Sequence, residues 1–144
     1  ILGGGPDSKL FKTVREKNSL CYYISSNAQP LNSILTISAG INKKDFTNAV
    51  NLIKKEVANM KKGKFGDDDI IKAKITYVNS MKELEDSEQS LISLYAGMEY
   101  LNSDNLDQRF IKINKVTKAN VIKLASKIHL DTIYLLEGDS NEKK

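Results

Sequence analysis

Histidine, cysteine, tryptophan and arginine are all scarce in this chain. Its 144 residues include one histidine, His129, one cysteine, Cys21, and no tryptophan. A single cysteine excludes an internal disulfide. One histidine and one cysteine are also too few for a metal site built from grouped His, Cys, Asp and Glu ligands. The sequence therefore predicts neither a metal site nor a cofactor, and Cys21, which lies in an apolar run, is typical of a buried small hydrophobe.

Long apolar runs and strong charge of one sign are missing as well. No apolar run approaches the roughly 18 residues of a membrane span, and no signal peptide is visible. These two absences predict a cytoplasmic protein without a membrane partner. The net charge is +4, and the lysines are interspersed with acidic residues. Because they form no basic stripe, the charge pattern predicts no nucleic-acid partner.

The start of the chain looks like the end of an element. The sequence opens with "ILGGGP" and has no initiator Met. Ile1 and Leu2 are typical of the last apolar turn of a helix, and the glycines are typical of its stop signal. We therefore expect a single domain over residues 1–144 that is truncated at its N-terminal side, with a frayed tail over residues 138–144.

Hydrophobic periodicity predicts an α+β fold in which an antiparallel sheet packs against several helices. Apolar residues alternate with polar ones over residues 33–41, the pattern of a half-buried strand. Other strands are predicted at residues 20–26 and 132–136. Helices are predicted at residues 9–17 and 43–62, after Asp67, after Ser87, at residues 106–113 and after Thr117. Asn42 and Asp45 have the spacing of a capping box.

The glycine-rich stretch "GGGPDSK" does not fit a nucleotide-binding loop. A phosphate-binding P-loop needs GxxxxGK[ST], and no glycine directly precedes Lys9. A dinucleotide loop needs a glycine at Ser8 and a strand before it. Because both patterns fail, the stretch indicates a turn.

Only two of the 22 basic residues are arginine, and one of them lies in "VREKNSLCYY". In one interpretation, Arg15 is an exposed helix residue and Tyr22 is a core residue of the next strand. In the other, a guanidinium fork and a phenol converge from a helix end and the adjoining strand. Such a pair can bind a peptide carbonyl, and the phenol can donate to a developing oxyanion. Lysine replaces a planar fork poorly, which would explain an arginine here.

The segment "LGGGPDSKLFKTVREKNSLCYYISS" resembles the C-terminal half of insulinase/pitrilysin-type zinc peptidases, which include mitochondrial processing peptidase. The family pattern runs roughly LGGG-x-x-S-R-L-F-x-x-[LV]-R-E-x-x-x-L-[AG]-Y. Lys9 stands where arginine is common, and Cys21 stands where alanine or glycine is common. The ending "VTKANVIKLASKIHLDTIYLLEGD" is similar to the family's ending, and the details are most similar to Gram-positive bacterial members.

The resemblance implies a fold of two similar α+β lobes that face each other. The N-terminal lobe of the family carries the zinc motif HxxEH, which this chain lacks. The C-terminal lobe carries an arginine and a tyrosine that reach the substrate, and these roles fall on Arg15 and Tyr22. The chain would then be the substrate-binding C-terminal lobe of a zinc-dependent endopeptidase and would be inactive alone, without catalytic residues of its own.

The partners implied are a peptide substrate and an N-terminal lobe or homologous subunit, with zinc held in that other lobe if the whole protein is active. The alternative is a non-catalytic scaffold or interaction subunit that partners an active homologous peptidase. Since the strand over residues 33–41 is long and poor in charge, the chain alone is also expected to self-associate.

Overall fold

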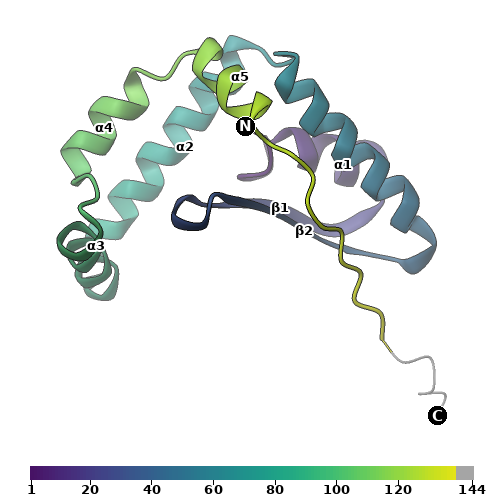
Figure 1. Cartoon of the computed structure of the whole chain (residues 1–144), viewed down its shortest axis with the longest axis horizontal. Helices are drawn as coiled ribbons and strands as arrows, with labels where there is room; N and C mark the ends of the chain where they lie inside the picture. Colours follow the sequence, from purple (N-terminus) through teal and green to yellow (C-terminus); the bar gives the residue numbers. More distant parts are fainter. Residues whose placement is uncertain (139–144) are drawn as a thin grey trace.

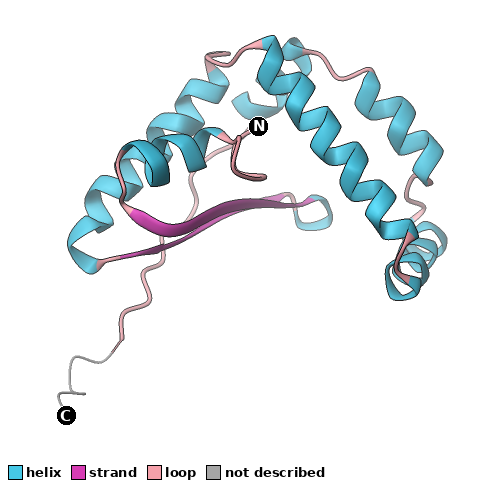
Figure 2. Cartoon of the chain, turned by 180° about the vertical axis from the view of Figure 1, so that it is seen from behind, coloured by secondary structure: helices cyan, strands magenta, loops and turns pink. Residues whose placement is uncertain are grey.

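The computed structural model describes residues 1–138, apart from the side chain of Glu85. A two-stranded antiparallel sheet lies beneath an arch of helices, and its other face is left open (Figures 1 and 2). This arrangement confirms the predicted α+β class. The predicted fraying of residues 138–144 concerns a segment that, apart from Gly138, lies outside the described residues.

The sheet is a hairpin of β1 (Cys21–Gln29) and β2 (Ile34–Ile41), closed by the short 3₁₀ helix η2 (Pro30–Asn32). Ile24 pairs with Ala39, and Asn27 pairs with Thr36. Along β2, Leu35, Ile37, Ala39 and Ile41 are half-buried, while Thr36 and Ser38 are exposed. The predicted alternation is therefore confirmed. On the open face, the ring of Tyr23 lies so close over Gly40 that no side chain could be added there.

The apolar face of the hairpin packs against η1 (Phe11–Lys17), whose hydrogen bonds follow the wide π-helical pattern. Leu10 and Val14 are fully buried, and together with Ile24 and Ala49 they form the first core cluster. Residues 9–17 were predicted to be helical. Two helical residues, Lys9 and Leu10, precede the π-helical turn.

The first three residues connect this core to the rest of the molecule. The carbonyls of Ile1 and Leu2 accept hydrogen bonds from the N–H groups of Lys9 and Leu10, at 3.0 and 2.9 Å. The carbonyl of Gly3 accepts from the Ser26 N–H at 2.9 Å. Ile1 and Leu2 carry no regular secondary structure of their own, and a turn over residues 3–8 follows them. The Lys9 and Leu10 bonds thus hold Ile1 and Leu2 at the start of the first helix, and the Ser26 bond holds Gly3 on β1.

Within the described residues, five α-helices follow the hairpin, and the starts of the last four agree with the sequence signals. They are α1 (Phe46–Lys61), α2 (Asp67–Glu85), α3 (Glu88–Leu101), α4 (Leu106–Asn114) and α5 (Lys118–Ser126). Ser87, Asn105 and Thr117 cap the last three through their side chains. The predicted capping box at Asn42 and Asp45 is not formed at α1, which is preceded by the short 3₁₀ helix η3 (Lys43–Asp45).

The helices form two groups, and the first group contains a second core cluster. Met60, Phe65, Ile70 and Ala125 make this cluster where α5 packs on α1. Leu2 packs against both clusters and so joins them. At the other end of α2, α3 and α4 pack beside it (Figure 1). No helix within the described residues is long and apolar enough to cross a bilayer.

The prediction of a strand at residues 132–136 is wrong. The chain beyond α5 has no regular secondary structure up to Gly138 and runs past the sheet (Figure 1). Its apolar side chains are largely solvated, with Tyr134 79% and Leu136 80% exposed. A strand needs a neighbouring ladder, and the described sheet contains only β1 and β2.

Replacement of Gly3 by alanine tests the contact between the N-terminal segment and β1. A Cβ at Gly3 would lie 2.7 Å from the backbone nitrogen of Ser26, whereas one at Gly4 would meet nothing within 4 Å. Because backbone cannot move aside as a flexible side chain can, we expect Gly3→Ala to lower the free energy of unfolding by about 1–3 kcal/mol. Gly4→Ala is the matched control and should change it by less than about 0.5 kcal/mol. Urea denaturation would measure both, and equal values for the two variants would contradict the close packing.

Asp69 links the start of α2 to the N-terminal segment and should make stability depend on pH. Its carboxylate accepts from the Gly66 N–H at 2.8 Å and pairs with Lys9 Nζ at 2.8 Å. Burial is the largest single influence on the pKa of Asp69 and raises it, but the bonds from Lys9 and Gly66 together bring the pKa below its usual value. The ionised form is therefore favoured by folding, and its contribution is present above the unfolded pKa.

We expect Asp69→Ala to lower stability by about 1 kcal/mol at pH 7, the usual effect of losing a helix cap. The difference from the native chain should vanish as the pH falls from about 4 through the lowered folded pKa. Asp68→Ala is the control, since Asp68 is in the same first turn and exposed. Thermal melts between pH 2 and pH 7 would measure the effect, and a difference that does not change with pH would contradict the role of the charge.

Candidate functional site

Arg15 projects from η1 because its neighbours anchor the helix. Val14 is fully buried, whereas the next residue, Arg15, is exposed. The Arg15 Cζ atom lies 4.8 Å from the centroid of the Phe11 ring, in a cation–π contact. Such a contact contributes about 0.5–1 kcal/mol at an exposed site. Phe11 thus restricts the guanidinium without using its N–H donors, which remain directed to solvent or a ligand.

Tyr22 projects from an irregularity in β1. Cys21 pairs with Ile41 and Tyr23 pairs with Gly40, so Tyr22 is the extra residue of a bulge. Bulges re-aim a side chain relative to the pleat of the strand. The Tyr22 side chain is 67% exposed, so the interpretation of Tyr22 as a core residue is wrong. Its hydroxyl donates to Asn42 Oδ1 at 3.0 Å.

A tight connection brings the two residues to one end of the hairpin. Only Asn18, Ser19 and Leu20 separate η1 from β1. Ser19 has a φ of 51°, and its N–H donates to the Arg15 carbonyl at 3.0 Å. The Leu20 N–H donates to the Val14 carbonyl at 3.0 Å. These bonds fix the end of η1 against the start of β1.

Cys21 lies between Arg15 and Tyr22 in the sequence, and its side chain behaves as a core side chain. Burial raises the pKa of its thiol, and the charge of Arg15 lowers it only in part. A thiol with a raised pKa has little thiolate at neutral pH and is a poor nucleophile. Cys21 therefore gives the site no nucleophile.

The two arginines of the chain are used differently. Arg109 Nε donates to the Asp104 carbonyl at 2.8 Å, and Nη2 lies 3.5 Å from Ser103 Oγ. It thereby holds the loop between α3 and α4. Within residues 1–138, Arg15 forms neither a hydrogen bond from its guanidinium nor an ion pair. A planar fork that is oriented but not engaged is suited to a ligand carboxylate or carbonyl.

Asn42 and Asp45 were not predicted as site residues. Asn42 Nδ2 donates to Asp45 Oδ2 at 3.4 Å, and Asn42 Oδ1 receives the Tyr22 proton. The sequence signal that could have found them is their spacing, which was assigned to a helix cap. The amide is used instead by a side chain twenty residues away in the sequence.

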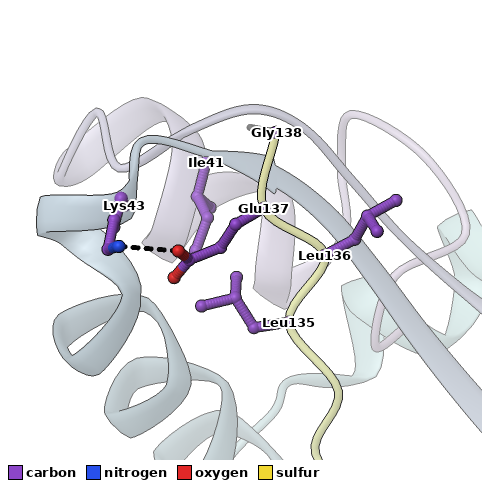
Figure 3. A pocket seen from close by; sticks show the side chains of 6 residues that line it. All are labelled: Ile41, Lys43, Leu135, Leu136, Glu137 and Gly138. Carbon is purple, nitrogen blue, oxygen red and sulfur yellow. Dashed lines mark hydrogen bonds and ion pairs between the residues drawn. The ribbon is translucent and has the colours of Figure 1, made fainter. Parts of the chain in front are cut away.

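A shallow hollow adjoins Asn42 at the end of β2. Its volume is about 260 Å³, and it is lined by Ile41, Lys43 and residues 135–138 (Figure 3). Lys43 Nζ and Glu137 Oε2 form an ion pair at 2.6 Å across its rim. Since both side chains are well exposed, with relative areas of 77% and 40%, the pair contributes little to stability. It does hold the C-terminal segment beside the candidate site.

The residues present do not fit a zinc site. No group of three or more His, Cys, Asp or Glu side chains that could hold a metal occurs in the part of the chain that the structure describes. A catalytic zinc requires three protein ligands and an open position. Hydrolysis by a metal-activated water therefore has no basis in these residues.

The comparisons with known proteins decide the family. Residues 1–77 match the family model described as the peptidase M16 inactive domain. The chain belongs to the peptidase M16 family. The match includes the hairpin and the whole opening segment, with Arg15 and Tyr22, that carried the resemblance in the sequence. The predicted family is thus confirmed.

Relatives of this M16 chain are longer than the chain itself. It is 36% identical over 139 residues to the "Probable inactive metalloprotease YmfF" of Bacillus subtilis, which covers 96% of this chain and 33% of that protein. The crystal structure of a conserved protein from Enterococcus faecalis V583 is similar, with a TM-score of 0.79, 28% identity, and coverage of 86% and 30% of the two chains. The peptidase M16 inactive domain from Pseudomonas fluorescens has a TM-score of 0.77 at 22% identity, with coverage of 91% and 32%. The chain spans about a third of the length of each of these proteins.

Proposed function

We propose that this M16 inactive domain is a peptide-binding lobe that presents Arg15 and Tyr22 to an extended substrate, while any zinc ligands come from another lobe. The observation that carries the proposal is that Phe11 orients Arg15 while its donors are unengaged within residues 1–138, and that Tyr22 is exposed in a bulge of the adjoining strand. The guanidinium would bind a peptide carbonyl or carboxylate, and the phenol would make a further hydrogen bond. The cytoplasmic location predicted from the sequence stays a prediction.

A second candidate is a non-catalytic scaffold that partners an active homologue. It is favoured by the name of the B. subtilis relative, a probable inactive metalloprotease. Neither candidate function requires zinc in this lobe, but the two functions differ in what the lobe contacts. A scaffold needs a surface for a homologous subunit, whereas a substrate-binding lobe needs Arg15 and Tyr22 for peptide.

Arg15→Lys and Tyr22→Phe in the full-length two-lobe protein separate the two candidates. Arg15→Lys keeps the charge but loses the fork, and should weaken peptide binding by about 1.5–3 kcal/mol, as for a hydrogen bond to a charged group. Tyr22→Phe should weaken it by about 0.5–1.5 kcal/mol. Fluorescence anisotropy with a labelled casein digest would measure affinity, and thermal melts should show little loss of stability because both side chains are exposed.

The control for these variants is Tyr23→Phe, the adjacent tyrosine on the open face of the sheet. It should leave peptide affinity unchanged. If all three variants bind peptide like the native protein but still associate with an active homologue, the scaffold candidate is right and the substrate-binding candidate is wrong.

We also propose that the 144-residue chain alone self-associates. The described sheet has only two strands, so each has an outer edge without a ladder partner. Exposed apolar side chains on α3, such as Ile92 at 63% and Tyr100 at 86%, add to the surface available for association. Unpaired edges and apolar patches both recruit other chains.

Light scattering over a concentration series should show a mass that rises above the monomer mass. Hydrogen exchange of the β2 amides should slow in the associated form if the edges pair, and should stay unchanged if the α3 face is the contact. A constant monomer mass at millimolar concentration would rule out self-association by either route.

A further inference from the structure

The hydrogen bond between Tyr22 and Asn42 has a direction that the sequence did not predict. A phenol can donate or accept, and an asparagine amide offers a carbonyl oxygen on one side and an N–H₂ group on the other. Which group faces Tyr22 therefore decides whether the phenol gives or receives a proton. The direction of this bond also decides whether the phenol can still donate to a ligand or only accept from one.

Asp45 settles the orientation of the Asn42 amide. A carboxylate only accepts hydrogen bonds, so the amide side that faces it must be N–H₂. Asn42 Nδ2 lies 3.4 Å from Asp45 Oδ2, and the Oδ1 atom on the other side lies 3.0 Å from the Tyr22 hydroxyl. A flipped amide would place Oδ1 against the carboxylate, two acceptors without a proton between them. Since Oδ1 can only accept, the Tyr22 O–H must be the donor.

The backbone around Asn42 supports this arrangement. Asn42 has an extended backbone, with φ −77° and ψ 147°, directly before η3, which is the usual conformation of a capping residue. Its side chain nevertheless makes no capping hydrogen bond. The Asp45 N–H is bonded instead to the Asn42 backbone carbonyl at 2.9 Å. The Asn42 amide is thus available to Tyr22 and is held at both ends.

We infer that Asn42, oriented by Asp45, is a positioning residue that makes Tyr22 an acceptor for a peptide N–H. With its one proton donated to Asn42, the phenol has only lone pairs left for a ligand. Arg15, by contrast, has only donors. Arg15 would therefore bind a carbonyl of the peptide, and Tyr22 would bind an N–H. This inference rests on the proposed peptide-binding function for its ligand, but the polarity of Tyr22 can be tested without one.

The polarity is tested by NMR of the native chain with labelled asparagine side chains. In Tyr22→Phe, we expect the Asn42 Cγ resonance to shift because Oδ1 loses its donor, while the Nδ2 protons stay in place. In Asp45→Ala, we expect the Nδ2 resonances to shift, and the Cγ response to Tyr22→Phe to shrink as the amide becomes free to flip. A Tyr22→Phe change confined to the Nδ2 protons would show the opposite polarity and overturn the inference.

The use of this polarity is tested with the blocked pentapeptide acetyl-Ala-Ala-Phe-Ala-Ala-amide and analogues in which one amide N–H at a time is replaced by an ester oxygen. NMR titration measures affinity even when binding is weak. One analogue should bind the native chain about fivefold more weakly, the usual effect of one hydrogen bond. The same replacement should change affinity by less than about twofold in Tyr22→Phe and in Asn42→Ala, because the phenol is then absent or free to donate.

The outcomes separate the inference from the proposed function. If the pentapeptide does not perturb Arg15 or Tyr22 at all, the proposed function fails, and the asparagine resonances still decide the polarity. If Tyr22→Phe weakens binding but every ester penalty is the same in native and Asn42→Ala chains, the proposed function stands and the role of Asn42 is overturned. Asn48→Ala is the control, since Asn48 is an exposed asparagine on α1.

Discussion

The contact between Gly3 and Ser26 is the constraint on which the rest of the structure depends. Only a residue without a side chain allows the two backbones to approach closely enough for the Gly3 carbonyl to accept from the Ser26 N–H at 2.9 Å. The same short segment bonds to the start of η1, and Leu2 packs into both core clusters. One extended stretch therefore fixes η1 on the sheet and the sheet against the α1–α5 layer.

The candidate site is a consequence of this arrangement. With η1 held on the sheet, the end of the helix and the start of β1 can be joined by three residues, and Arg15 and Tyr22 come to the same end of the hairpin. Neither residue is in the core, so neither is needed for folding. Phe11 orients the first and Asn42 the second, in both cases through side-chain contacts. Because the frame and the site are separate, we expect both residues to tolerate exchange without unfolding of the chain.

The sequence was informative where a pattern is local. The five α-helices were predicted because caps and apolar periodicity act within one or two turns, and the half-buried strand β2 was predicted from its alternation. Failures occurred where structure depends on a distant partner. Residues 132–136 have strand-like residues but no ladder partner in the described sheet. Asn42 was assigned to a helix cap from its local spacing to Asp45. The hydrogen bond that its side chain makes instead comes from Tyr22, twenty residues away, which local spacing does not reveal. Arg15 and Tyr22 themselves were assigned their roles through the family resemblance, since spacing alone favoured an exposed helix arginine and a core tyrosine.

The central claim is that Arg15 and Tyr22 act as one peptide-binding unit. A double-mutant cycle with Arg15→Lys and Tyr22→Phe, measured as peptide affinity in the full-length two-lobe protein, tests it most directly. If both residues bind the same peptide unit, loss of either should displace the ligand from the other. The loss of binding free energy in the double variant should then be smaller than the sum of the two single losses, by at least about 0.5 kcal/mol. Strictly additive effects would show two independent contacts, and the absence of any effect would show that the site binds no peptide.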